Sequence, residues 1–459
     1  HRDLHSFSTR RSSDLHIAPR LFLRLQPHFR PTIRMKPEVH VPGPAAHLAI
    51  LHVLLHRPTA VVETDRDGFA AVRAHDARRV RGEFEFLVVF VVLVVSVHPV
   101  ASLTFDSSTF DFRLQVFPCP VSRLIIPPMP NSLILGTGFA VPDRIVTNDD
   151  LAALMDTSDE WITQRTGIRQ RHWVREGETG VDLAQAASLR ALEAAGLEPA
   201  ALDAIVYASS TPDHFAPGNG VYLQDRLGLG PIPALDVRAQ CAGFIYALAT
   251  ADGWIRSGLF RRILVVGQEI QSTGMDVTTQ GRNTAVIFAD GAGAVILGPS
   301  DDSSRGILSF DLHSDGANAD KLWVDAPGSM YHPRASVDQI EKGRHFLQMD
   351  GKEVFRHATT RMPESVRAAL TKAGLGTDAI SLLLPHQANL RISEMVQKEL
   401  GLRGDQVYNN IDRYGNTTAA TIPILLDESV RAGRVKPGDV LVFTAFGSGF
   451  MWGSCVVRW

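Results

Sequence analysis

Cysteine is scarce in this chain, which has only Cys119, Cys241 and Cys455 among its 459 residues. Three widely spaced thiols can build neither a disulfide framework nor a CxxC metal site, so the sequence predicts a reducing compartment, the cytoplasm, and no metal site. An excess of one charge is also lacking, because the formal net charge is -3. No global field favours nucleic acid, and an acidic partner would need a local basic patch.

Long hydrophobic runs are lacking too. The valine-rich run at residues 86–97 (FLVVFVVLVVSV) holds twelve residues, whereas a helix that spans a bilayer needs about 20. This length predicts no membrane association. A composition of 45% apolar and 21% charged residues is instead typical of a soluble globular protein with a large core.

Residues 1–128 differ in composition from the rest of the chain. They hold ten of the seventeen histidines and fifteen arginines, but one lysine and neither tryptophan nor tyrosine. We interpret this segment as an atypical extension, either disordered or a product of spurious upstream translation, with Met129 as the true start; a genuine extension is the alternative. From Ser132 onward the sequence SLILGTGFAVPDR begins with a strand pattern.

The remainder alternates short apolar runs with amphipathic helical patterns, which predicts an α/β fold with covered sheets. The predicted strands are 204–209, 263–267, 285–288, 294–297, 380–384 and 440–445. An internal repeat aligns LRALEAAGLEPAALDAIVYAS from Leu189 with VRAALTKAGLGTDAISLLLPH ending at His386. In each copy an amphipathic helix ends at a glycine, Gly196 or Gly374, and leads into a buried strand. We therefore predict two similar halves, 129–300 and 301–459.

A second pairing relates two helix starts. Counting back by the same interval from Gly258 and Gly433, where two helices end, leads to Cys241 in one half and Asn416 in the other. Two similar halves that share a core would place these helix N termini near a pseudo-twofold axis. Because a helix N terminus stabilises a thiolate, Cys241 is a candidate nucleophile with a lowered pKa. A buried structural cysteine is the alternative.

His386 and Asn416 are the other candidate catalytic residues. His386 directly follows the apolar run ISLLLP and could donate to an oxyanion or transfer a proton. Asn416 begins a helix and could be a neutral donor to the same oxyanion, or a plain N-cap. The loop of Gly447, Ser448 and Gly449 could add backbone N–H donors or form a simple tight turn. The glycine-rich segment FADGAGAVIL lacks a phosphate-binding spacing and predicts close strand packing.

Six motifs together resemble one enzyme family. They are SDEWITQRTGIRQRH (158–172), QCAGFIYAL (240–248), FADGAGAVIL (288–297), HQANLRI (386–392), YGNTTAATIP (414–423) and FGSGFMWGS (446–454). Their order over residues 132–459 resembles β-ketoacyl-acyl-carrier-protein synthase III, the initiating condensing enzyme of type II fatty acid synthesis. The resemblance implies the thiolase fold, in which two duplicated α/β halves form αβαβα layers, and a homodimer.

The resemblance also implies a catalytic triad of Cys241, His386 and Asn416. The cysteine would take an acyl group from acyl-CoA, and the His-Asn pair would stabilise the enolate formed when malonyl-acyl carrier protein loses carbon dioxide. The enolate would attack the acyl-cysteine to give a β-ketoacyl-acyl carrier protein. The CoA thioesters are substrates, and no cofactor is implied. Cys455 does not match the second catalytic cysteine of thiolases.

Further residues are assigned to substrates by their motif positions. The resemblance assigns CoA binding to Trp161, Arg165, Arg282 and Asn389, the acyl pocket to Ala216, Phe355 and Phe446, and a basic patch for the acidic carrier protein to Arg356, Arg391 and Lys398. Trp161 would lie in a helix capped by Thr157 and Glu160, with its ring free to stack on adenine. A core tryptophan is the alternative.

Two positions depart from the family pattern. Ser448 stands where the family usually has glycine, so the oxyanion loop is expected to be slightly altered. Ala216 stands where the family often has a bulky residue that closes the acyl pocket of the neighbouring subunit. The smaller side chain predicts room for a longer or branched acyl primer than acetyl.

Two other functions are compatible with parts of this pattern. Acyl transfer to another nucleophile without decarboxylation, as in a secondary-metabolite pathway, would keep Cys241 but has no enolate to stabilise. The presence of both His386 and Asn416 therefore favours condensation. A non-catalytic binding homologue would not require Cys241.

Overall fold

The computed structural model describes residues 131–459 and, before them, four strands at 60–64, 70–74, 101–106 and 111–116. The chain divides into two units, His1–Ile126 and Pro127–Trp459. In the first unit, β1 (Ala60–Thr64), β2 (Ala70–Ala74), β4 (Asp111–Val116) and β3 (Ala101–Asp106) form an antiparallel sheet in this order. The apolar run at 86–97 lies outside the described residues, and the interpretation of 1–128 stays a prediction.

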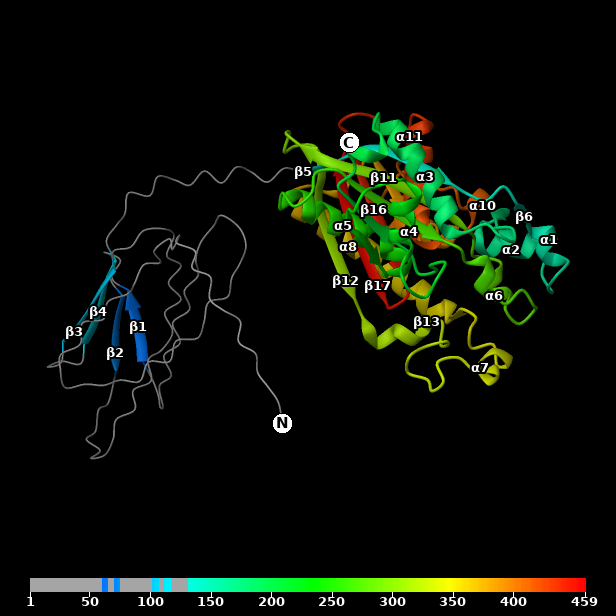
Figure 1. The fold of residues 1–459 in the computed structure, drawn as a ribbon, viewed down its shortest axis with the longest axis horizontal. Helices are drawn as coiled ribbons and strands as arrows, with labels where there is room; N and C mark the ends of the chain where they lie inside the picture. Colours follow the sequence, from blue (N-terminus) through cyan, green and yellow to red (C-terminus); the bar gives the residue numbers. More distant parts are fainter. Residues whose placement is uncertain (1–59, 65–69, 75–100, 107–110, 117–130) are drawn as a thin grey trace, which may run out of the picture. The chain divides into compact units, whose positions relative to one another are not determined.

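The second unit is built around two sheets of matching topology (Figure 1). The first has the order β5 (Asn131–Ala140), β11 (Gly291–Ser300), β10 (Ile263–Glu269), β8 (Ala204–Ala208) and β9 (Ala234–Val237). The second has the order β12 (Gly306–Ser314), β17 (Met451–Arg458), β16 (Val440–Gly447) and β15 (Leu382–Pro385). In both sheets the first three strands pair antiparallel and the fourth pairs parallel with the third. The predicted duplication is therefore confirmed, and the two sheets lie on either side of the predicted boundary at residue 300.

Helices form three layers around these sheets. The outer face of the first sheet is covered by α3 (Gly180–Ala195) and α4 (Asn219–Arg226), and that of the second by α8 (Gly351–Lys372) and α9 (Leu390–Leu400). Between the sheets lie α5 (Gly243–Arg256) and α11 (Thr421–Arg431). Every residue of β8, β10 and β16 is buried, because both faces of each sheet are covered. The predicted αβαβα thiolase fold is confirmed.

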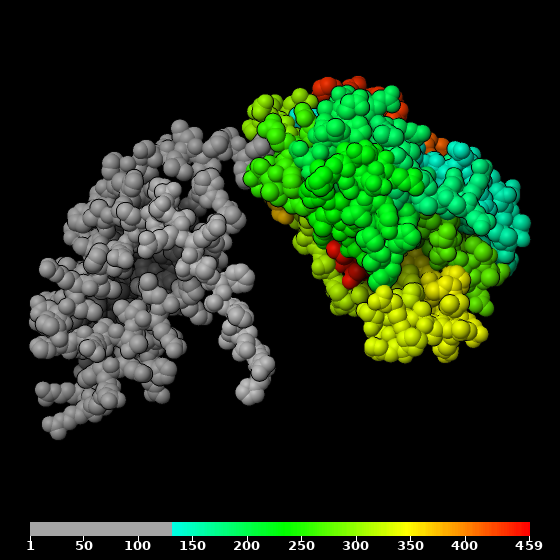
Figure 2. All heavy atoms as spheres, viewed as in Figure 1, coloured from blue at the N-terminus to red at the C-terminus, as the bar shows by residue number. Residues whose placement is uncertain are grey.

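Smaller elements flank these layers. Beside the first sheet lie β6 (Ile145–Thr147), α1 (Asn148–Ala152), α2 (Asp159–Thr166), β7 (Gln170–His172), α6 (Arg282–Ala285) and α10 (Ile411–Tyr414). An excursion between β12 and α8, yellow in Figure 2, contains β13 (Leu322–Trp323), α7 (Val337–Glu341) and β14 (Gln348–Met349). Among the described residues, no helix combines the length and the apolar character that crossing a bilayer would require.

The predicted strand at 285–288 is wrong. Helix α6 ends at Ala285, and Phe288 forms an isolated bridge with Asn416. An apolar run of four residues does not distinguish a strand from a buried helical turn. The glycine-rich segment that follows packs closely, as predicted, since a Cβ atom on Gly293 would lie 2.7 Å from the Cβ of Pro423 in α11.

The predicted equivalence of Cys241 and Asn416 is also wrong. A 3₁₀ turn precedes each central helix, Gln240–Ala242 before α5 and Thr418–Ala420 before α11, and each turn begins at a residue with positive φ. These matching turns pair Cys241 with Ala419. Counting back the same number of residues from Gly258 and Gly433 fails to pair equivalent positions, because α11 has 11 residues and α5 has 14.

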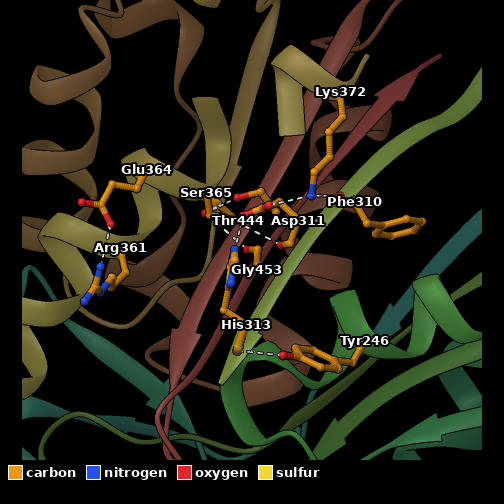
Figure 3. A network of polar contacts seen from close by, with 11 residues as sticks. Tyr246, Phe310, Asp311, His313, Arg361, Glu364, Ser365, Lys372, Thr444 and Gly453 are labelled. Carbon is orange, nitrogen blue, oxygen red and sulfur yellow. Dashed lines mark hydrogen bonds and ion pairs between the residues drawn. The ribbon is translucent and has the colours of Figure 1, made fainter. Parts of the chain in front are cut away.

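Polar contacts around the buried carboxylate of Asp311 connect helices from two layers to the edge strand β12 (Figure 3). The side chain of Asp311 accepts hydrogen bonds from Lys372 Nζ in α8 and from His313 Nε2, both at 2.7 Å. Tyr246 in α5 donates to the carbonyl oxygen of His313 at 2.8 Å. Burial alone would raise the pKa of Asp311, but the bonds from Lys372 and His313 hold this pKa below its ordinary value.

We expect Lys372→Met to lower the free energy of unfolding by about 1–3 kcal/mol near neutral pH, because the buried carboxylate loses a charged donor. A carboxylate with a depressed pKa stabilises the fold above its unfolded pKa, and this contribution disappears as pH falls through the folded pKa. The loss should therefore shrink below about pH 4. Urea denaturation near neutral pH and below about pH 4 tests this. Lys342→Met is the control, because the Lys342–Asp338 pair is exposed and should contribute less than about 1 kcal/mol.

Candidate active site

Cys241 lies at the junction of the two halves. It is the middle residue of the 3₁₀ turn before α5, and its side chain is buried. The turn packs against its counterpart in the other half, and a Cβ atom on the next residue, Gly243, would lie 3.4 Å from the Cβ of Ala419. The sequence placed the thiol at a helix start, and the structure confirms that α5 begins two residues later.

The expected depression of the thiol pKa is wrong in direction. Burial and the nearby charge of Glu269 raise the pKa of Cys241 to about 12, although the backbone N–H groups of Cys241 and Ser448 favour the thiolate. In this site the cost of removing the thiolate from water exceeds the stabilisation that these donors provide. The resting nucleophile is therefore a neutral thiol that must lose its proton when it reacts.

The predicted oxyanion loop closes over the thiol. Gly447, at the end of β16, leaves no space for a side chain, because a Cβ atom there would lie 2.7 Å from the Cβ of Cys241. The N–H of Ser448 acts on the sulfur in the direction that lowers the thiol pKa, and the Ser448 hydroxyl donates to the carbonyl oxygen of Leu322 in β13. The serine that departs from the family pattern thus ties this loop to the excursion after β12.

Asn416 is held by its backbone and its amide oxygen. Its N–H donates to Ile287 O at 3.0 Å, its carbonyl accepts from Ala289 N at 2.9 Å, and Oδ1 accepts from Thr418 N at 2.8 Å. Since Oδ1 is occupied, Nδ2 is the group left for a ligand. Asn416 does not begin α11 directly, as the sequence suggested, because the turn Thr418–Ala420 intervenes.

His386 is buried directly after β15, where the sequence placed it. Its backbone N–H donates to Thr444 O at 2.8 Å, and its ring Nδ1 lies 2.6 Å from Thr421 Oγ1, at the start of α11. Burial lowers the pKa of His386 to about 3, so the free ring is neutral. Nε2 is buried and has no partner among the described residues.

Glu269, at the end of β10, is a buried acid that the sequence reasoning missed. Its carboxylate accepts from the N–H and hydroxyl of Ser210, from the hydroxyl of Thr211 at 2.6 Å, and from Gln271 Nε2 at 3.3 Å. Burial raises the pKa of Glu269 to about 7 despite these donors. The glutamate ends an apolar strand, ILVVGQE, which is the one sequence signal that could have marked it.

The residues predicted to bind CoA come together at one surface site. The guanidinium carbons of Arg165 and Arg282 lie 4.5 and 5.3 Å from the centre of the Trp161 ring. Asn389 donates to Arg165 O at 3.0 Å and caps α9, so its amide links α9 to α2. The helix cap of α2 is Ser158, not the predicted Thr157. CoA binding by these residues stays a prediction.

The predicted acyl-pocket residues are not gathered in one place. Phe446 packs in the buried cluster on the α8 side of the second sheet, with its ring centre 4.8 Å from that of Phe450. Ala216 lies in an exposed loop before α4. Phe355 lines a surface groove of about 450 Å³ together with Arg391 and Lys398, which were predicted to bind the carrier protein.

Arg356, the third member of the predicted basic patch, is not among the residues that line the groove. Arg356 is exposed and paired with Glu353 at 2.5 Å, which partly neutralises its charge. Arg391 and Lys398 are exposed on α9, at the groove that also contains Glu394 and Met395. The roles assigned to all three basic residues stay predictions.

Two duplicated halves, with the cysteine turn packed against the turn that holds Asn416 and leads to Thr421 beside His386, are the arrangement of a condensing enzyme of the thiolase fold. Family models described as 3-oxoacyl-[acyl-carrier-protein] synthase III match residues 235–316 and, for the C-terminal part, 370–459. The β-ketoacyl-[acyl-carrier-protein] synthase III of Rhizobium meliloti is 44% identical over 339 residues, which span 72% of this chain and 100% of the relative. The chain belongs to the β-ketoacyl-[acyl-carrier-protein] synthase III family.

Solved structures agree with this assignment. The 3-oxoacyl-[acyl-carrier-protein] synthase III of Aquifex aeolicus is 39% identical, with a TM-score of 0.66 over 72% of this chain and 100% of that one. The priming β-ketosynthase of the R1128 polyketide pathway is 34% identical, with a TM-score of 0.66 over 73% of this chain and 98% of that one.

We expect Gly447→Ala to reduce acylation of Cys241 by about 100-fold or more, because the added methyl group displaces the nucleophile or the loop. The rate of acyl-enzyme formation from acyl-CoA, followed by intact-protein mass, measures this loss. Gly253→Ala is the matched control, since a Cβ atom there meets nothing within 4 Å, and it should acylate normally. Equal rates for both variants would show that the loop is not packed against Cys241.

We expect the alkylation rate of Cys241 by iodoacetamide to rise about tenfold per pH unit between roughly pH 6 and 9, because the thiolate fraction grows in this way below the thiol pKa. Cys241→Ala provides the background from Cys119, and Cys455 is fully buried. Mass spectrometry of the modified protein gives the rates. A plateau near neutral pH would instead show that alkylation does not follow the thiolate fraction of a thiol with a high pKa.

Proposed function

We propose that this enzyme condenses an acyl-CoA primer with malonyl-acyl carrier protein to give a β-ketoacyl-acyl carrier protein. The observation that supports the proposal is the packing of the Cys241 turn against Gly447 and against the turn that holds Asn416 and leads to Thr421, the partner of His386. A nucleophile beside preorganised donors is the arrangement that both acyl transfer and enolate stabilisation require.

The reaction has two halves. First, the sulfur of Cys241 attacks the thioester carbonyl of acyl-CoA and the CoA thiol leaves. Malonyl-acyl carrier protein then binds and loses carbon dioxide, and His386 and Asn416 stabilise the resulting enolate oxygen. The enolate carbon attacks the acyl-cysteine, and Cys241 leaves as the new carbon–carbon bond forms. The acyl group and the enolate are supplied by the substrates, so the scheme needs no cofactor.

Surface features support the proposed partners. Arg165 and Arg282, beside the Trp161 ring, provide cations for CoA phosphates and an aromatic face for adenine. The groove with Arg391 and Lys398 offers positive charge and an apolar floor to an acidic carrier protein with its prosthetic arm. We assign both substrates to these sites.

A homodimer completes the proposal. Strand β9 is the edge of the first sheet, and Leu235 on it is exposed. An unpaired apolar edge strand is a template for pairing with a second chain. The exposed Ala216 would then face the acyl pocket of the partner subunit, where its small size leaves room for a long or branched primer. Free thiols at Cys241 and Cys455 support a reducing compartment, the cytoplasm.

We expect the full chain to gain the mass of one acyl group with at least one chain-length class from acetyl- to dodecanoyl-CoA, and Cys241→Ala to gain none. Addition of malonyl-acyl carrier protein should then release carbon dioxide and form a β-ketoacyl product, measured by mass spectrometry. Stable acylation without carbon dioxide release would favour acyl transfer to another nucleophile. The absence of acylation by every primer would reject a catalytic role for Cys241.

A further inference from the structure

Thr421 is the residue that contacts the inner nitrogen of the His386 ring. Its hydroxyl oxygen lies 2.6 Å from His386 Nδ1 and 3.0 Å from the carbonyl oxygen of Thr418. Both side chains are buried, with exposed fractions of 2%. The opposite nitrogen, Nε2, is buried without a partner among residues 131–459, and is thus the nitrogen available to substrate.

The single hydroxyl hydrogen decides which ring nitrogen carries the proton. The carbonyl of Thr418 has no hydrogen to give, so its 3.0 Å contact is a hydrogen bond only if Thr421 donates. The hydroxyl oxygen must then accept from Nδ1–H. If the hydroxyl of Thr421 donated to Nδ1 instead, its oxygen and the carbonyl oxygen of Thr418 would lie 3.0 Å apart with no hydrogen between them. The two linked hydrogen bonds, from Nδ1–H to the hydroxyl and from the hydroxyl to the carbonyl, also strengthen each other cooperatively.

We propose that Thr421 is a positioning residue that fixes the proton of neutral His386 on Nδ1, so that Nε2 accepts the proton of Cys241 during acylation. This inference rests on the proposed function. It matches a nucleophile that is a neutral thiol at rest, because such a thiol needs a base when it attacks. Since the pKa of His386 is about 3 and that of Cys241 is about 12, the proton moves only as the sulfur–carbon bond forms.

The protons balance through the two half-reactions. In acylation, the sulfur–carbon bond forms, the thiol proton moves from Cys241 to Nε2, and the departing CoA sulfur takes it. In condensation, Nε2 takes one proton from solvent as the malonyl carboxylate arrives, since a neighbouring negative charge favours the imidazolium. Nε2–H and Asn416 Nδ2 donate to the enolate oxygen, and the departing Cys241 thiolate recovers the proton. One proton is consumed per turnover, as loss of a carboxylate as carbon dioxide requires.

The same turn positions both donors. Thr418 N–H holds Oδ1 of Asn416 at 2.8 Å, and Thr418 O holds the Thr421 hydroxyl. The hydroxyl of Thr418 accepts from Gln271 Nε2 at 3.0 Å, and Gln271 in turn bonds Glu269. Thr418 has a φ of 51°, a conformation that non-glycine residues rarely adopt. The strained residue therefore orients Asn416 directly and His386 through Thr421.

The test uses the full chain labelled with ¹⁵N-histidine, with His386→Asn to assign the signals. Long-range ¹H–¹⁵N correlations should show the free wild-type enzyme protonated at Nδ1 of His386. Thr421→Val should lose this tautomer preference and acylate at least about tenfold more slowly. Thr421→Ser should restore both within about twofold. Ser429→Ala is the matched control, since it removes another buried hydroxyl of α11 that donates to a backbone carbonyl, Leu425 O.

Each outcome is informative. Protonation of wild-type His386 at Nε2 would overturn the proposal, as would Thr421→Val with wild-type tautomer and rate. Because the first readout uses the wild-type enzyme, it decides the matter even if Thr421→Val does not fold. Failure of the wild-type chain to acylate would instead contradict the proposed function, while the tautomer measurement would still stand.

Discussion

The packing of two 3₁₀ turns against each other is the constraint on which the site depends. Gln240–Ala242 and Thr418–Ala420 occupy equivalent positions in the two halves and meet between the sheets. The duplicated fold sets their approach, because each turn precedes a central helix and packs against a central strand of the opposite sheet, β16 for the first turn and β10 for the second. Divergence within this symmetric frame supplies the chemistry: one turn carries the cysteine, and the other carries alanine and orients the asparagine and histidine.

The buried acid Glu269 disfavours a second negative charge on Cys241 at this junction. Glu269 accepts at least four hydrogen bonds, yet burial still raises its pKa to about 7. Its negative charge in turn raises the pKa of Cys241. Two anions so close together in a low dielectric would repel strongly. The glutamate also connects Ser210 and Thr211, at the start of the loop that contains Ala216, to Gln271, which contacts the turn at Thr418. It therefore joins the catalytic turn to the loop that faces the proposed partner subunit.

The sequence predicted the fold because its elements leave local signals, and it located Cys241 and His386 beside the elements where the structure has them, while their catalytic roles stay predictions. Buried strands read as apolar runs, and the repeat from Leu189 exposed the duplication. The error at 285–288 came from a run too short to have a period, and the pairing of Cys241 with Asn416 came from unequal helix lengths that no motif reveals. The thiol pKa could not be predicted, because burial depends on contacts such as that of Gly447, which is more than 200 residues away in the chain. Thr421 was overlooked because a hydroxyl at a helix start usually indicates a cap.

A nucleophile that is neutral at rest suits a reaction whose negative charge arrives with the second substrate. A permanent thiolate would repel the malonyl carboxylate. Neutral donors such as the amide of Asn416 and the N–H of Ser448 can stabilise developing charge without adding a permanent charge. Acylation also removes the only ionisable group of the nucleophile before the carboxylate enters. The order of the reaction, with the acyl-CoA first and the malonyl substrate second, follows because the enolate needs the acyl-cysteine as its electrophile.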